Sequence, residues 1–134
     1  MKHIAKKKFG QNFLKDVSII HSIIQSINPL LDDALIEIGP GLGALTKPLL
    51  EKSNHLLAIE LDRDIVSWME KEYPKKKITI FNEDVLNFNF HQFDQKVRIV
   101  GNLPYNISTP VLFKCIENIV IIIFRIINNI IKFI

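Results

Sequence analysis

Apolar residues recur along the chain with two different spacings. Between Asp16 and Ile27 the isoleucines fall on one helical stripe, which predicts an amphipathic helix that Asp16 caps. Elsewhere the apolar residues form short, mostly apolar runs, which are typical of strands buried in a sheet. The runs that predict strands are 34–38, 55–60, 78–81 and 97–100.

Helical patterns separate these runs. Residues 44–52 have helical spacing, and a second helix is expected to begin at a cap on Asp64 and to stop before Pro74. The stretch 108–110, Ser-Thr-Pro, looks like a cap followed by proline, so a further helix is predicted to start there. Strands that alternate with helices indicate an α/β fold, in which helices cover both faces of a parallel sheet. Such sheets bind ligands beyond the carboxyl ends of their strands.

The segment 116–134 departs from both patterns. It holds ten isoleucines among 19 residues, its polar positions are mainly Asn and Lys, and it has no clean helical period. We interpret it as an aberrant tail that resembles A/T-rich sequence translated without selection for packing. An ordinary buried helix is the alternative. The predicted domain is therefore 1–115.

Composition adds a compartment and a possible partner. The chain is 48% hydrophobic and 23% charged, which is typical of a soluble globular protein without a membrane span. Cys115 is the single cysteine, which excludes a disulfide scaffold and favours the cytoplasm. The net charge is +3, and the positive excess lies in a basic arm, residues 1–16, with five lysines. Such an arm suits nucleic acid, but a solvated terminus that binds nothing accounts for it equally well.

Candidate binding residues follow the first two strands. The stretch 37–43, Glu-Ile-Gly-Pro-Gly-Leu-Gly, lies between a strand and a helix, where glycines let a ligand approach the main chain. Gly39, Gly41 and Ala44 fit the dinucleotide fingerprint and equally the loop of S-adenosylmethionine (SAM) enzymes. Glu60 ends the second strand, where a carboxylate can accept both ribose hydroxyls. These two sites leave NAD and SAM both open.

The residues after the third and fourth strands favour SAM. Asp84 is placed to accept from an adenine amino group, although a loop acid without a function would look the same. The fourth strand leads into Asn102-Leu103-Pro104-Tyr105. A nucleobase amino nitrogen is a poor nucleophile, so methyl transfer to it needs hydrogen-bond acceptors for its protons.

The segment 102–105 offers these acceptors. The side-chain oxygen of Asn102 is one, and a backbone carbonyl at Leu103 or Pro104 is the other. Tyr105 supplies a ring on which a flipped base can stack. We predict that these four residues hold the base to be methylated.

On these residues the chain resembles the ribosomal RNA adenine N6,N6-dimethyltransferases, which use SAM to dimethylate two adjacent adenines near the 3′ end of small-subunit rRNA. The resemblance extends over about residues 7–114, and the segments that carry it are 9–14, 37–43, 59–62, Asp84 and 101–110. It implies a Rossmann-like class I methyltransferase sheet with SAM as methyl donor and no metal. It also implies 16S rRNA or a pre-30S particle as the partner in the cytoplasm.

The resemblance also assigns roles to individual residues. Those expected to bind SAM are Asn12, Leu14, Gly39, Gly41, Glu60, Asp84 and Asn102. Asn12 and Leu14 would close over its methionine end, and Gly39 would contact it through the backbone. Glu60 would hold the ribose and Asp84 the adenine amino group. Asn102 to Tyr105 would hold the target base.

Three family features have no counterpart in this sequence. The family has a seven-stranded sheet, of which about four strands are predicted here, a later F-x-P-x-P-x-V motif and a C-terminal helical domain. We therefore expect the N-terminal part of such an enzyme, ended by a frameshift or a premature stop. The alternatives are a non-catalytic remnant that binds SAM or RNA only, and an NAD-dependent dehydrogenase. Residues 102–105 give hydride transfer no role, which disfavours the dehydrogenase.

Overall fold

The computed structural model describes residues 14–103, 105–117 and 121–126. Its strands form one parallel sheet in the order β3-β2-β1-β4-β5. The strands are β1 (Leu35–Ile38), β2 (Leu56–Ile59), β3 (Ile78–Phe81), β4 (Arg98–Leu103) and β5 (Ile121–Ile126). The helices are α1 (Val17–Ile27), α2 (Thr46–Lys52), α3 (Arg63–Glu72), α4 (Tyr105–Glu117) and the short 3₁₀ helix η2 (Phe90–Gln92).

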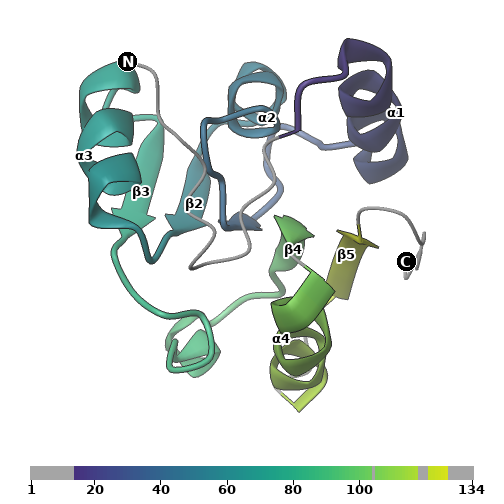
Figure 1. The fold of residues 1–134 in the computed structure, drawn as a ribbon, viewed down its shortest axis with the longest axis vertical. Coiled ribbons are helices and arrows are strands. Elements are labelled where there is room, and N and C mark those ends of the chain that lie inside the picture. Colours follow the sequence, from purple (N-terminus) through teal and green to yellow (C-terminus); the bar gives the residue numbers. More distant parts are fainter. Residues whose placement is uncertain (1–13, 104, 118–120, 127–134) are drawn as a thin grey trace.

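Helices cover both faces of the sheet, with α1, α2 and α3 on one face and α4 on the other (Figure 1). Neighbouring strand residues point to opposite faces, so Leu35 packs with the first group of helices and Ile36 with the second. The α/β architecture predicted from the sequence is confirmed. No helix in the described part of the chain is long and apolar enough to cross a membrane.

Two predicted helix starts are wrong. Asp62, not Asp64, caps α3, because the Asp62 carboxylate accepts from the N–H of Asp64 at 2.9 Å. α4 begins at Tyr105 rather than near Ser108, and Pro110 lies inside it. The reason is that β4 runs on to Leu103, so the chain passes almost directly from strand to helix. Asp16 does cap α1, as predicted, by accepting from the N–H groups of Ser18 and Ile19.

The sheet holds one strand more than the four predicted. β5 lies within the segment interpreted as an aberrant tail, and it pairs with β4 from Arg98 to Leu103. The stretch 121–126 is thus a strand and not the buried helix offered as the alternative. Its run of apolar, mostly β-branched residues suits a parallel strand, where a helical period is not needed. The predicted boundary at residue 115 stays a prediction, although α4 continues across it to Glu117.

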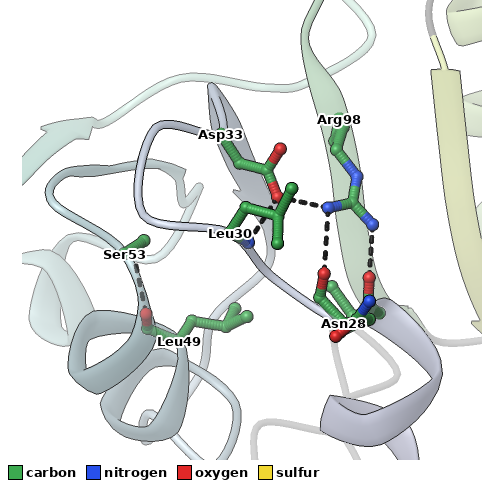
Figure 2. A network of polar contacts seen from close by, with 7 residues as sticks. Asn28, Leu30, Asp33, Leu49, Ser53 and Arg98 are labelled. Atoms are coloured by element: carbon green, nitrogen blue, oxygen red, sulfur yellow. Dashed lines mark hydrogen bonds and ion pairs between the residues drawn. The ribbon is translucent and has the colours of Figure 1, made fainter.

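At the amino ends of the strands, Arg98 joins three elements (Figure 2). Its guanidinium forms an ion pair with Asp33 in the loop before β1 and donates to the carbonyl of Ile27. It also donates to the carbonyl of Asn28, the residue after α1, at 3.4 Å. These carbonyls are left without intrahelical partners at a helix end, so Arg98 anchors α1 to the start of β4.

Candidate functional site

The loop between β1 and α2 turns through three glycines. Gly39, Gly41 and Gly43 have φ angles of +62°, +56° and +83°, which residues with a Cβ rarely adopt. The N–H of Gly39 donates to the carbonyl of Ile59 at 2.9 Å, which ties the loop to the end of β2. The structure therefore places the predicted glycine loop at the carboxyl edge of the sheet, where Gly39 is exposed.

Glu60 follows β2 and connects two loops. One carboxylate oxygen, Oε2, accepts from the N–H of Gly41 at 3.3 Å, and Oε1 accepts from the N–H of Asp62 at 2.9 Å. Burial raises the pKa of Glu60, while the N–H donors of Asp62 and Gly41 oppose that rise. A carboxylate has about four acceptor positions, so these two bonds leave others unused. Glu60 is 6% exposed and is not among the residues that line the cavity over the glycine loop.

Glu37 is a second buried acid at this edge. It lies in β1 with 2% of its surface exposed, and its Oε2 accepts from the hydroxyl of Thr46 in α2 at 2.7 Å. Burial raises the pKa of Glu37 to about 7; the Thr46 hydrogen bond opposes this, and the charge of Glu60 adds to it. A cationic ligand nearby would stabilise the charged form of both carboxylates. The sequence analysis included Glu37 in the glycine motif but gave it no role.

A cavity of about 320 Å³ lies over the glycine loop. Four of the residues assigned to SAM line it, namely Leu14, Gly39, Gly41 and Asn102, and so does Glu37. They come from the segment before α1, from β1 and the loop after it, and from β4. Distant parts of the sequence therefore meet at one site.

Three further lining residues, Lys15, Ile20 and Leu45, had no binding role predicted from the sequence. The available signal was their position, since Lys15 and Ile20 lie close to Leu14 in the sequence and Leu45 lies close to the glycine loop.

The segment 102–105 is divided between two elements. The sequence predicted that Asn102 and Leu103 follow the fourth strand. Both residues instead lie within β4, because β5 pairs with them. Asn102 is half-buried, whereas the side chain of Leu103 is buried in the core, so Leu103 can face a ligand only through its backbone. Tyr105 is the first residue of α4. Asn12 and Pro104 lie outside the described residues.

Asp84 lies in the loop after β3 and is not among the residues that line the cavity. It is half-buried, and its Oδ1 accepts from the N–H of Leu86 at 2.9 Å. The loop is close to Glu60, because Asn82 in it donates to the carbonyl of Glu60 at 2.9 Å. In the part of the chain that the structure describes, no cluster of three or more His, Cys, Asp or Glu side chains could hold a metal ion.

Comparison with known proteins identifies the family to which this chain belongs. A family model described as "Ribosomal RNA adenine dimethylase" matches residues 2–129. The chain belongs to this family. Among curated relatives, "Ribosomal RNA small subunit methyltransferase A" of Methylobacillus flagellatus is 56% identical over 119 residues, which is 89% of this chain and 47% of the relative. The protein of the same name from Bordetella pertussis is 51% identical over 111 residues, 83% of this chain and 42% of the relative.

Solved structures agree with the dimethylase assignment. The 23S rRNA methyltransferase ErmE is 25% identical with a TM-score of 0.75, over 86% of this chain and 47% of that one. A dimethyladenosine transferase from Plasmodium falciparum is 27% identical with a TM-score of 0.68, over 85% of this chain and 43% of that one. The Rossmann-like methyltransferase fold implied by the resemblance is confirmed. The chain spans about half the length of the curated relatives it matches.

Proposed function

We propose that this chain is the cofactor-binding part of a cytoplasmic enzyme that uses SAM to dimethylate the N6 amino groups of two adjacent adenines in small-subunit (16S) rRNA. The names of the curated relatives support the substrate. The observation that carries the proposal is the cavity that Asn102 shares with the glycine loop. A base amino group at Asn102 would lie next to a cofactor held by that loop.

The described residues fit SAM. The lone pairs of Glu60 that Gly41 and Asp62 leave unused can accept the ribose hydroxyls. Gly39 is exposed and has no Cβ, so its peptide can lie against the ligand. Asp84 can accept from the adenine amino group with acceptor positions beyond the one that Leu86 uses. Asn12 and Leu14 would cover the methionine end, and the buried acids suit a sulfonium cation.

The chemistry then depends on how the target amino group is held. SAM supplies an electrophilic methyl group when it is bound. The side-chain oxygen of Asn102 and a backbone carbonyl at Leu103 or Pro104 accept the amino protons, which turns the nitrogen lone pair toward the methyl group. Tyr105 stacks on the flipped adenine. The N–C bond would form as the S–C bond of the sulfonium breaks, leaving S-adenosylhomocysteine, and the nitrogen would release one proton to solvent, so no strong general base is required.

A basic arm at residues 1–16 would add affinity for the rRNA phosphates. The 16S rRNA or a pre-30S particle is the proposed partner. Membership of a family named for RNA adenine dimethylation favours SAM over NAD as the cofactor.

Methyl transfer from radiolabelled SAM to small-subunit particles that lack these methyl groups tests the proposal. Because the chain spans about half of its relatives, we expect incorporation at the two adjacent adenines with a full-length relative and none with that relative's equivalent of Asn102→Ala. This chain and its own Asn102→Ala variant should bind SAM with similar affinity, because Asn102 acts mainly in the transition state. SAM binding without transfer by the parent would favour the non-catalytic alternative. Transfer that persists in Asn102→Ala would contradict the role of Asn102.

A further inference from the structure

The backbone that follows β2 is held from the neighbouring strand by one side chain. Asn82, the first residue after β3, donates through its Nδ2 atom to two consecutive carbonyls, that of Glu60 at 2.9 Å and that of Leu61 at 3.2 Å. The N–H of Glu60 also donates to the carbonyl of Phe81 at 3.0 Å. The side-chain amide of Asn82 thus donates to the two carbonyls that come directly after β2.

These contacts reach the carboxylate of Glu60 through a single peptide group. The peptide between Leu61 and Asp62 carries the carbonyl that Asn82 holds and the N–H that donates to Glu60 Oε1 at 2.9 Å. A trans peptide is planar, with its C=O and N–H pointing in opposite directions. Fixing the carbonyl therefore fixes the direction of the N–H, and with it the position of the carboxylate.

The position of this carboxylate matters because its other oxygen, Oε2, bonds to the glycine loop at Gly41. Asn82 is exposed, so its side chain is not needed to fill the core. The hydrogen bonds of its side-chain amide therefore fix the backbone at Glu60 and Leu61 and do not serve core packing. Asp84, two residues further on, belongs to the same loop as Asn82.

We infer that Asn82 is a positioning residue for the Glu60 carboxylate, and that it tunes SAM affinity through the ribose without touching the ligand. This inference rests on the proposed function. Asn82→Ala removes both donors, and Asn82→Asp keeps the shape but places oxygens against the two carbonyls. Asn89→Ala is the matched control, because Asn89 is also exposed and uses its side chain on backbone away from Glu60, accepting from the N–H of His91 in η2 at 3.0 Å.

The first arm of the test needs no ligand. Hydrogen exchange of the Asp62 amide, read by NMR in the parent and the variants, reports whether the peptide still points at Glu60. We expect exchange to rise about fivefold or more in Asn82→Ala and further in Asn82→Asp, and to stay unchanged in Asn89→Ala. An unchanged Asp62 amide in both Asn82 variants would overturn the inference.

The second arm measures SAM affinity by calorimetry. Asn82→Ala should raise the Kd about threefold to tenfold in the parent, and less than about twofold when Glu60→Gln is already present, because the two residues act in one chain of contacts. An equal loss in both backgrounds would show a merely structural role and overturn the inference. If the parent chain does not bind SAM, the proposed function is contradicted. The hydrogen-exchange measurement needs no SAM, so it still tests the role of Asn82 in that case.

Discussion

Gly43 offers a test of the glycine loop in which strain and steric overlap can be separated. Its φ is +83°, and a Cβ placed on it would lie 2.3 Å from Oη of Tyr73 and 3.4 Å from Cζ of the same ring. Gly39 has a similar φ of +62°, but a Cβ there would meet its nearest atom, Cδ2 of Leu103, at an ordinary 3.5 Å. Gly39→Ala is therefore the matched control for Gly43→Ala.

The two substitutions should differ by the cost of the overlap. A left-handed backbone costs a residue with a Cβ about 1–2 kcal/mol, so Gly39→Ala should lower the free energy of unfolding by about that amount. Gly43→Ala carries the same strain and forces Tyr73 to shift, which adds about 1–3 kcal/mol. Its total loss should therefore be about 2–5 kcal/mol. Replacing Tyr73 with Phe removes the oxygen and leaves the nearest ring atom at 3.4 Å.

Urea unfolding followed by circular dichroism measures these differences. In the Tyr73→Phe background, Gly43→Ala should lose no more than Gly39→Ala does in the parent, about 1–2 kcal/mol. If Gly43→Ala and Gly39→Ala are equally destabilising in the parent, or if Tyr73→Phe gives no relief, Tyr73 does not pack beneath this loop as the structure shows.

Three other predictions concern charged groups. The pKa of Glu37 is raised from 4.5 to about 7, so the folded chain binds the proton of this carboxyl group more tightly than the unfolded chain does. The free energy of unfolding should therefore fall by on the order of 3 kcal/mol as the pH rises between these two values. Glu37→Gln should remove most of that fall between about pH 5 and about pH 8 in urea unfolding, and an identical pH profile would contradict the burial of Glu37. Arg98→Ala leaves the carbonyls of Ile27 and Asn28 and the Asp33 carboxylate without this donor, so unfolding should become easier by about 1–3 kcal/mol; a loss below about 0.5 kcal/mol would show that Arg98 does not anchor α1. Finally, calorimetry should show that SAM binds more tightly than its inosyl analogue, which lacks the amino donor, and that Asp84→Ala removes the preference; equal affinity in the parent would exclude Asp84 from the adenine pocket.

Local pattern was enough to predict most elements of the fold. The apolar runs at β1 and β2 are largely buried in a parallel sheet, and the run at β3 forms its partly exposed edge strand. Ile23, Ile24 and Ile27 of the isoleucine stripe form the buried face of α1. β5 was missed because its isoleucine-rich run has neither a period-2 alternation nor a helical period, so it resembles sequence without selection. The end of β4 was misplaced because its last residues, Asn102 and Leu103, are in the sheet only through their pairing with β5.

The site was predictable in its motif residues and not in their supports. A glycine loop after a strand and Glu60 at the end of the next strand are local signals in the sequence. The contact of Tyr73 with Gly43 and the hold of Asn82 on the Glu60 loop depend on how separate elements pack. The same holds for Lys15, which precedes α1 and lines the cavity. The position of α1 depends on contacts with distant residues, such as the bond from Arg98 to the carbonyl of Ile27. Such contacts leave no periodic or spaced pattern in the sequence.

Calorimetry tests whether this carboxyl edge of the sheet binds SAM through Glu60. SAM and NADH are titrated separately into the parent chain and into Glu60→Ala. We expect SAM to bind the parent at one site, Glu60→Ala to weaken binding about tenfold or more through loss of hydrogen bonds to the ribose, and NADH not to bind. Binding of NADH in place of SAM, or equal SAM affinity of the parent and Glu60→Ala, would contradict this expectation.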